Sequence, residues 1–204
     1  MPDPIRRNLF ANLGLVPRTF VPPDSGREVM RKRYFPNVPL VTHDGKPVHF
    51  YDDLLKDKIV VLNLMYADCT TLCPMITANL VKAQKILASR TTQEVSFVSL
   101  TIKPHDDTPE KLRAYASMHH ATKNWLFVTG QPDNLELLRQ KLGYADANPE
   151  KDRKDRALHS GMVRYGNEPL SQWSSIQGSA DPDWIAEEIT YVMPPRAVRQ
   201  ASAR

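Results

Sequence analysis

Residues 58–80 read KIVVLNLMYADCTTLCPMITANL, and they contain both cysteines of a 204-residue chain, Cys69 and Cys73. The first part, Lys58 to Ala67, is a run of β-branched and long aliphatic side chains, which is typical of a strand buried on both faces. Pro74 suits the first turn of a helix, and apolar residues recur behind it at helical spacing. The stretch therefore predicts a buried strand, a cysteine-bearing loop and a helix.

The alternation of strands and helices continues along the chain. Glu94 to Ile102 and Trp125 to Gly130 have the composition of two further buried strands. Between them a helix is expected to start with Thr108 as its N-cap. The next helix is expected to stop at Gly143, and a closing helix to start at Asp181.

Two hairpins flank this alternation. Residues 36–53, PNVPLVTHDGKPVHFYDD, alternate around a turn at residues 43–46. Residues 158–170, LHSGMVRYGNEPL, are expected to turn at the Gly-Asn pair 166–167. The polar stretch before them, ADANPEKDRKDRA at residues 145–157, is expected to be an exposed and mobile loop, because nothing in it can build a core.

This order of elements predicts an α/β fold with a mostly parallel central sheet, flanked by helices and extended by an N-terminal and a C-terminal hairpin. A cysteine pair that follows a long buried strand and opens a helix resembles a thioredoxin-like layout. Ligands of open α/β sheets gather outside the carboxyl ends of the strands, where the cysteines fall. We divide the chain into an extended N-terminal arm or linker at residues 1–34, the folded domain at 35–193 and a disordered basic tail at 194–204.

The composition and charge of the chain argue against a nucleic-acid-binding protein and against a chain that crosses a membrane. Hydrophobic residues make up 41% of the chain, so the core does not need a disulfide or a metal for stability. The net charge of +4 comes largely from basic residues near both ends, a pattern typical of solvated extensions, and we expect no nucleic-acid binding. No apolar run approaches the ~18–20 residues that cross a bilayer, and residues 1–17 lack the hydrophobic part of a signal peptide. The protein is expected either to be cytosolic or to belong with an export segment or anchor that this sequence does not contain.

The spacing of the cysteines favours a redox or metal-binding role over a structural crosslink. A disulfide between them closes a very short loop and contributes little chain-entropy stabilisation. If the first helical turn begins near Cys69, Cys73 lies on the same face with the two Cβ atoms ~5–6 Å apart, which permits either a disulfide or one metal ion shared by both sulfurs. A helix N-terminus also lowers a cysteine pKa and so favours the thiolate. The two sulfurs are therefore candidate catalytic groups as well as candidate metal ligands.

Two thiolates leave a metal ion under-coordinated, so a third ligand is expected among the six histidines. Turn, strand and helix-end positions account for four of them without a ligand role. His105 follows the second long strand and is a candidate for an outer role beside the ligands. His159 lies between the polar loop and the last hairpin, where a thioredoxin-like sheet can bring it over the cysteines. Two soft thiolates and an imidazole favour Cu(I) or Cu(II) over hard cations, and zinc is an alternative that needs a fourth ligand.

These landmarks resemble the Sco/SenC family, copper-binding proteins of cytochrome c oxidase assembly, over residues 35–193. The C-x-x-x-C-P sequence of the family is matched by residues 69–74, CTTLCP, and its downstream histidine followed by Ser or Thr is matched by His159 and Ser160. The D-T-P helix start of the family is matched at residues 107–109. Its aromatic-x-x-x-T-G strand end is matched by WLFVTG, which ends at residue 130.

The resemblance implies a thioredoxin-like fold with copper, as Cu(I) or Cu(II), bound by Cys69, Cys73 and His159. It implies a copper-delivery protein, or a reductant of the cysteines at an oxidase copper site. The implied partners are the copper-site subunit of cytochrome c oxidase and other copper chaperones. The implied location is the periplasmic or intermembrane-space side of a membrane, with the full-length protein tethered there, and we expect a monomer. Thr70 stands where many members have proline, and Lys103 where an acidic residue is usual.

Two other functions fit the same cysteines. The first is a thiol–disulfide oxidoreductase or a thiol peroxidase on the same fold. The usual dithiol spacing of the former is C-x-x-C, one residue shorter than here. The P-x-x-x-T-x-x-C frame of peroxidases is matched by Thr70 but not by Tyr66, which occupies the proline position. The second is a structural module in which the cysteines are incidental.

Overall fold

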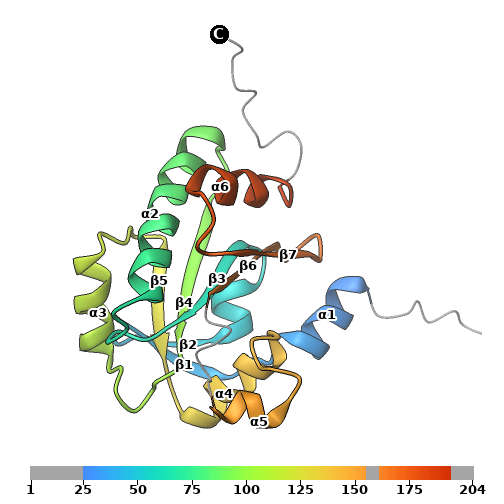
Figure 1. Cartoon of the computed structure of the whole chain (residues 1–204). Helices are drawn as coiled ribbons and strands as arrows, with labels where there is room; N and C mark the ends of the chain where they lie inside the picture. The colour runs from blue at the N-terminus through green and yellow to red at the C-terminus, as the bar shows by residue number, and fades with distance from the viewer. Residues whose placement is uncertain (1–24, 155–160, 194–204) are drawn as a thin grey trace, which may run out of the picture.

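The computed structural model describes residues 25–154 and 161–193. Within these ranges, seven strands form one sheet in the spatial order β2-β1-β5-β4-β3-β6-β7 (Figure 1). The strands are β1 (Pro39–Thr42), β2 (Pro47–His49), β3 (Ile59–Met65), β4 (Val95–Thr101), β5 (Trp125–Thr129), β6 (Met162–Asn167) and β7 (Gln172–Gln177). The central strands β5, β4 and β3 are parallel, as the alternating pattern predicts. The two hairpins add antiparallel pairs at the edges, so the sheet as a whole is mixed.

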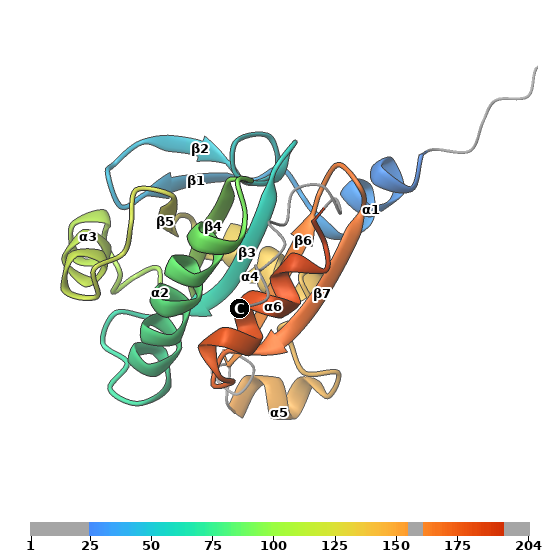
Figure 2. The same cartoon turned by 90° about the horizontal axis from the view of Figure 1, so that it is seen from above.

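Helices cover both faces of this sheet. They are α1 (Gly26–Tyr34), α2 (Leu72–Arg90), α3 (Pro109–Met118), α4 (Pro132–Lys141), α5 (Pro149–Lys154) and α6 (Pro182–Thr190), together with a π-helical turn, η2 (Phe50–Leu55). α2, α3 and α6 bury their apolar residues against one face, with α2 and α6 next to each other (Figure 2). α4, η2 and the partly buried residues of α1 pack against the other face. The sheet flanked by helices is the expected thioredoxin-like arrangement.

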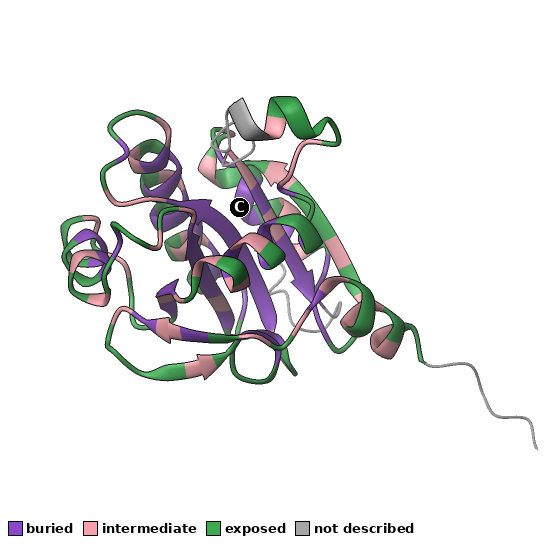
Figure 3. Cartoon of the chain, turned by 90° about the horizontal axis from the view of Figure 1, so that it is seen from below, coloured by how far each residue is buried: buried purple, intermediate pink, exposed green. Residues whose placement is uncertain are grey.

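β3 lies between β4 and β6, and all of its residues are buried (Figure 3). Val61 and Met65 belong to the core under α2, whereas Leu62 belongs to the core on the opposite face. Burial on both faces explains why this strand is continuously apolar rather than alternating. The exception is Asn63, whose side-chain oxygen accepts a hydrogen bond of 2.7 Å from the Ser99 hydroxyl in β4.

The predicted helix ends are confirmed by their hydrogen bonds. The Thr108 hydroxyl caps α3 by accepting from the Lys111 N–H at 3.3 Å, and the Asp181 carboxylate caps α6 by accepting from the Asp183 N–H at 2.8 Å. Gly143 follows the end of α4 with a φ of 71°, a left-handed conformation that stops a helix and that glycine adopts without strain.

Residues 26–34 form helix α1, where the sequence pattern predicted only an extended arm. The pattern failed because α1 has no buried residue and is held by polar contacts with distant parts of the chain. Arg27 donates two hydrogen bonds, of 2.8 and 2.7 Å, to the carboxylate of Glu168. Glu168 also accepts from the Tyr51 hydroxyl and the Asp57 N–H. It is only 3% exposed and lies between β6 and β7, so one buried carboxylate ties α1 to the C-terminal hairpin.

The C-terminal hairpin turns two residues later than the sequence predicted. Gly166 and Asn167 are paired in the ladder, opposite Trp173 and Gln172, and residues 168–171 make the turn. Packing rather than a turn requires the glycine, because a Cβ atom at position 166 would lie 2.4 Å from the Trp173 ring. Glycine is therefore needed at position 166 because two strands approach closely there, and the Gly-Asn pair does not form the turn.

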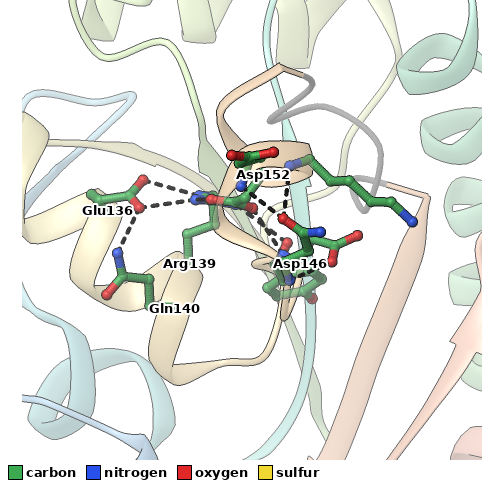
Figure 4. Close-up of polar contacts among 9 residues, drawn as sticks. Glu136, Arg139, Gln140, Asp146 and Asp152 are labelled. Atoms are coloured by element: carbon green, nitrogen blue, oxygen red, sulfur yellow. Dashed lines mark hydrogen bonds and ion pairs between the residues drawn. The ribbon is translucent and has the colours of Figure 1, made fainter.

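Residues 145–157, expected to be an exposed loop, include the short helix α5 and part of a buried ion-pair network (Figure 4). Arg139 from α4 is 3% exposed and donates hydrogen bonds to the carboxylates of Glu136 and Asp152. Asp152 also accepts from the Asp146 N–H at 2.8 Å. Residues 149–154 thus form a helix where a loop was expected, anchored by a charged residue rather than an apolar one. Residues 147–151 are exposed, as expected, and the mobility of the stretch stays a prediction. Its last residues, 155–157, lie outside the described ranges.

Replacing the buried carboxylate, Glu168→Gln, should destabilise the protein by about 2–3 kcal/mol, because Arg27 loses the buried one of its two carboxylate partners. Burial alone would raise the pKa of Glu168, but hydrogen bonds from Arg27, Tyr51 and the Asp57 N–H lower it below its ordinary value. The stabilisation is therefore present above the unfolded-state pKa of 4.5 and is lost as the pH falls through the lower folded-state pKa. Urea unfolding of both proteins across this pH range measures the difference.

Asp183→Asn is the matched control for this substitution. Asp183 also pairs with an arginine, Arg90, at 2.8 Å, but its side chain is 70% exposed. The control should change the free energy of unfolding by less than about 1 kcal/mol. Equal effects of the two substitutions would mean that the Glu168 contacts do not hold α1.

Candidate metal centre

Both cysteines lie at the carboxyl end of β3, as the sequence predicted. Cys69 is in the loop between β3 and α2, and Cys73 is the second residue of α2, which begins at Leu72 rather than near Cys69. The two residues are nevertheless in contact, because the Cys73 N–H donates a hydrogen bond of 3.3 Å to Cys69 Sγ. Both thiols are free and buried, with exposures of 7% for Cys69 and 3% for Cys73.

Cys69 Sγ acts as an acceptor at the start of α2. The first N–H groups of a helix have no partner within it and need an acceptor from outside. The N-cap residue, Thr71, makes no side-chain hydrogen bond to the helix. The sulfur of Cys69 meets part of this need, and the positive end of the helix dipole in turn stabilises a negative charge on that sulfur.

The surroundings of the two thiols separate their pKa values. Burial raises the pKa of Cys69, but hydrogen bonds from the Cys73 side chain and backbone, and from Thr71 and Tyr66, outweigh it and bring the pKa to about 7. Burial raises the pKa of Cys73 to about 12, and the hydrogen bond that its thiol shares with Cys69 adds to the rise. Above about pH 7 Cys69 is therefore mainly a thiolate while Cys73 keeps its proton, which makes Cys69 the more nucleophilic sulfur.

A buried carboxylate fastens the cysteine loop to the rest of the sheet. Asp107, 1% exposed, accepts from the Ala67 N–H, at 3.2 and 3.3 Å to its two oxygens. It also accepts from the Thr101 hydroxyl at the end of β4. On the surface, Lys111 pairs with Asp68 of the same loop at 2.5 Å. The loop that carries Cys69 is thus held to β4 and α3 before α2 begins.

Lys103, at the position where the related family usually has an acidic residue, contacts the same loop. Its ammonium group lies 4.2 Å from the centroid of the Tyr66 ring, within the range of a cation–π contact. Tyr66 in turn hydrogen-bonds to Cys69. Lys103 therefore places a positive charge one side chain away from Cys69.

The third expected ligand, His159, lies outside the described residues. Within residues 25–154 and 161–193, no group of three His, Cys, Asp or Glu side chains is arranged to hold a metal ion. His105 is exposed in the loop between β4 and α3, where it lines a pocket of about 280 Å³ together with Glu136 and Arg139. The described part of the site is thus a pair of adjacent sulfurs that can contribute two soft ligands to a metal ion.

Comparison with known proteins assigns the family. A family model described as SCO1/SenC matches residues 30–193. The chain belongs to the SCO1/SenC family. The SCO1 protein homolog of Bacillus subtilis is 31% identical over 150 residues, which are 71% of this chain and 75% of that protein.

Solved structures of the SCO1/SenC type share the fold. A SCO1/SenC family lipoprotein from Bacillus anthracis matches with a TM-score of 0.64 at 24% identity, covering 77% of this chain and 93% of its own. Yeast Sco1 with copper bound matches with a TM-score of 0.63 at 18% identity, covering 83% of this chain and 99% of its own. The mixed sheet flanked by helices is thus the fold of this family. Within the described residues, no helix has the length and apolar character needed to span a membrane.

Several residues that shape the site of this SCO1/SenC protein were not identified as functional from the sequence. Asp107 was noted only as part of a helix-start motif, yet it is the anchor of the cysteine loop. Tyr66 was considered only because it does not match the proline of the peroxidase motif, yet its side chain forms a hydrogen bond with Cys69. An aspartate directly before a Thr-Pro helix start is the one sequence signal that could have indicated the role of Asp107. No local sequence pattern indicates the contact between Tyr66 and Cys69.

Alkylation of the metal-free protein should distinguish the two thiols. The rate at Cys69 should rise as the pH passes through about 7, because the reactive thiolate forms above the pKa. Cys73 should react far more slowly throughout the neutral range, since its pKa is near 12. Iodoacetamide labelling at pH 5.5 to 9, followed by peptide mass spectrometry, gives both rates. Preferential labelling of Cys73 at neutral pH would reverse the assignment.

Proposed function

We propose that this SCO1/SenC protein binds copper through Cys69, Cys73 and His159 and serves the assembly of the copper site of cytochrome c oxidase. The observation that carries the proposal is the contact between two buried, free cysteines at the start of α2. Thiolates are soft ligands that suit Cu(I), and an imidazole ligand suits Cu(II) as well. The family assignment and the copper-bound yeast relative support the same metal.

The chain path supports His159 as the third ligand. The described structure resumes at Gly161, where a Cβ atom would lie 3.4 Å from the side chain of Leu72. Leu72 is the first residue of α2 and immediately precedes Cys73. Gly161 is also held in place by the Gly178 N–H, which donates to its carbonyl at 2.7 Å. Two residues of chain span at most about 7 Å, so the position of Gly161 is compatible with a chain path that brings His159 to the cysteines.

Copper is cargo in this proposal, and the residues of the chain prepare its binding. Cys69 is positioned by the N–H groups of α2, and Asp107 holds its loop against β4. Cys73 must release its proton to become a ligand, so copper binding is coupled to proton release. Burial of both sulfurs limits the access of water and of dissolved oxidants. The chain then delivers copper to the oxidase, or keeps the cysteines of the oxidase copper site reduced.

The same proposal includes a cellular location. A solved relative is described as a SCO1/SenC family lipoprotein, which is a membrane-attached class of protein. We place the domain on the periplasmic or intermembrane-space side of a membrane, tethered there in the full-length protein and acting as a monomer. Its partners are then the copper-site subunit of the oxidase and other copper chaperones.

A thiol–disulfide oxidoreductase is the second candidate, and the separated pKa values of the cysteines favour it. Cys69 as a thiolate attacks one sulfur of a substrate disulfide, forms a mixed disulfide and releases one substrate thiolate. Cys73 loses its proton and attacks Cys69 Sγ, which releases the second substrate thiolate and leaves a Cys69–Cys73 disulfide. Two electrons pass from the dithiol to the substrate. This chemistry also describes the reduction of oxidase cysteines, so the two candidates share one site.

Removal of the histidine should separate the two oxidation states of copper. His159→Ala should retain Cu(I), which the two thiolates hold, but weaken Cu(II) binding by at least about a hundredfold, because loss of even an outer partner of a metal ligand costs 10–100-fold. Cys69→Ser or Cys73→Ser should abolish binding of both ions. Titration of each variant against a chelator specific for each oxidation state gives the affinities.

His105→Ala is the matched control for the histidine variant. His105 is exposed in the loop between β4 and α3 and is no ligand in the proposal. Copper affinities that are unchanged in this variant and reduced in His159→Ala support the three-ligand site. If His159→Ala binds Cu(II) as tightly as the wild type, the proposed ligand set is wrong.

Oxidation of the protein should abolish copper binding rather than weaken it. A Cys69–Cys73 disulfide has no thiolate to offer, whereas the dithiol form has two potential ligands. The two forms can be prepared with diamide and with dithiothreitol and then freed of reagent before titration. Equal copper binding by the oxidised and reduced forms would give the oxidoreductase function first place.

A further inference from the structure

A second cavity lies on the face of the sheet opposite α2 and the cysteines. It has a volume of about 420 Å³ and is bounded by α1, the end of α4 and the β6–β7 hairpin. Figure 2 shows α1 beside this hairpin, where the contacts between Arg27 and Glu168 hold it. None of the residues around the cavity belongs to the cysteine loop or to α2. The cavity is therefore separate from the candidate metal centre.

Apolar side chains form most of the cavity wall. Phe35 and Trp173 face each other with their ring centroids 4.5 Å apart, one at the end of α1 and the other on β7. Met30, Leu62 and Leu142 complete the apolar lining. Volumes of about 300–1,000 Å³ with predominantly apolar walls are typical of small-molecule sites. Shape and lining thus suit an organic group.

The charges at this cavity are all positive. Arg164 and Lys141 contribute to the lining, which contains no aspartate or glutamate. The Arg164 guanidinium donates to the Gly143 carbonyl at 3.1 Å and lies 5.3 Å from the centroid of the Tyr144 ring. Within the described residues, neither cation forms an ion pair. This differs from Arg27 and Arg139, each of which meets two carboxylates.

Two hydrogen-bond donors at the cavity also lack acceptors. The Nε atom of Arg164 and the Nε1 atom of Trp173 are buried and have no hydrogen-bond partner in the part of the chain that the structure describes. A buried donor without an acceptor costs about 1–3 kcal/mol, more when it is charged. Both belong to side chains that line the same cavity. An acceptor that enters the cavity and draws these side chains toward it would relieve both penalties.

We propose that this cavity binds a small organic anion, a carboxylate carried on an aromatic or aliphatic body. The body packs against Phe35, Trp173 and Leu142, and the carboxylate accepts hydrogen bonds from Arg164 and from the indole N–H of Trp173. Lys141 at the exposed rim adds attraction for the negative charge. A cation finds no acidic ligand here, and a neutral apolar molecule leaves the guanidinium without its counter-charge.

The probe for this site is 1-naphthaleneacetate, with its neutral amide as the matched control ligand. The full chain contains three tryptophans, so its nitrogen-15 spectrum shows three indole N–H signals, assigned by single Trp→Phe substitutions. The Trp173 signal should move downfield and saturate as it gains an acceptor. Trp125 already donates to the Ser99 hydroxyl at 2.8 Å in the core, and Trp184 is 57% exposed on α6, so both signals should stay in place. The amide should bind at least about tenfold more weakly, because it lacks the charge.

Variants of the two cations give the second measurement. Arg164→Gln should weaken naphthaleneacetate binding by about tenfold or more, and Lys141→Gln by up to about fivefold, since a charge at the rim is screened by solvent. Arg113→Gln is the matched control, because Arg113 is an exposed arginine that donates to the His43 carbonyl away from the cavity. It should leave the affinity unchanged. If Arg164→Gln does not fold, Lys141→Gln and the comparison of acid with amide still test the proposal in a folded protein.

Three results would overturn the proposal. The first is an unchanged Trp173 signal at millimolar naphthaleneacetate. The second is equal affinity for the acid and its amide, which would mean an apolar cleft without anion preference. The third is an equal loss of affinity in Arg113→Gln and Lys141→Gln, which would mean attraction to the overall charge of the protein. None of these measurements involves copper, so their outcome is independent of the proposed metal function.

Discussion

The burial of β3 on both faces and both edges is the constraint from which the rest of the structure follows. A strand in this position has no surface to water, so its residues must be apolar or paired within the sheet. Asn63 satisfies this condition through Ser99, whose hydroxyl also accepts from Trp125, so one polar chain links three parallel strands. Because β3 cannot shift in register without exposing one set of side chains, the loop at its carboxyl end has a defined position. The cysteines are carried on that loop.

Two chemically identical thiols become different through their position at the start of α2. Cys69 lies outside the helix, and its sulfur accepts a hydrogen bond from the Cys73 N–H in the first turn, which favours the thiolate. Cys73 stands inside the first turn, more deeply buried, and gives its proton to the contact with Cys69. Among the described residues, no histidine or lysine is a main cause of this difference in pKa. The difference depends on the loop staying closed against the helix, which is the role of the Asp107 carboxylate between Ala67 and β4.

Buried polar anchors attach the peripheral elements of this fold, in addition to apolar contacts such as those of Met30 and Tyr34 in α1. α1 is held by Arg27 on the buried Glu168, and α5 by Asp152 on the buried Arg139 (Figure 4). In each case one charged residue is buried because a partner on another element satisfies its hydrogen bonds. The attachment of α1 also completes the cavity beside Trp173, where Arg164 lacks a comparable partner. The contrast between paired and unpaired arginines is the basis for assigning that cavity to an anion.

The sequence by itself determined the elements whose signals are local. The continuous apolar run predicted β3, Thr108 and Asp181 predicted helix starts through their own hydrogen bonds, and the alternation of strands and helices predicted the parallel centre of the sheet. The motif CTTLCP predicted a site of reactive sulfur at the end of a buried strand. Each of these signals depends on neighbours within a few residues, so reading the chain in order is enough to find them.

Tertiary structure alone decided the features that join distant residues. Arg27 and Glu168 are 141 residues apart, so α1 could not be recognised in an arginine-rich segment with no apolar stripe. Gly166 resembled a turn residue, but the Trp173 ring that excludes a side chain there belongs to the opposite strand. The different pKa values of Cys69 and Cys73 could not be predicted without the start of α2 at Leu72. The position of the first helical turn decides which sulfur accepts a hydrogen bond and which donates it. Local patterns carry no information about such partners, because the energy of each contact arises only when folding brings the two residues together.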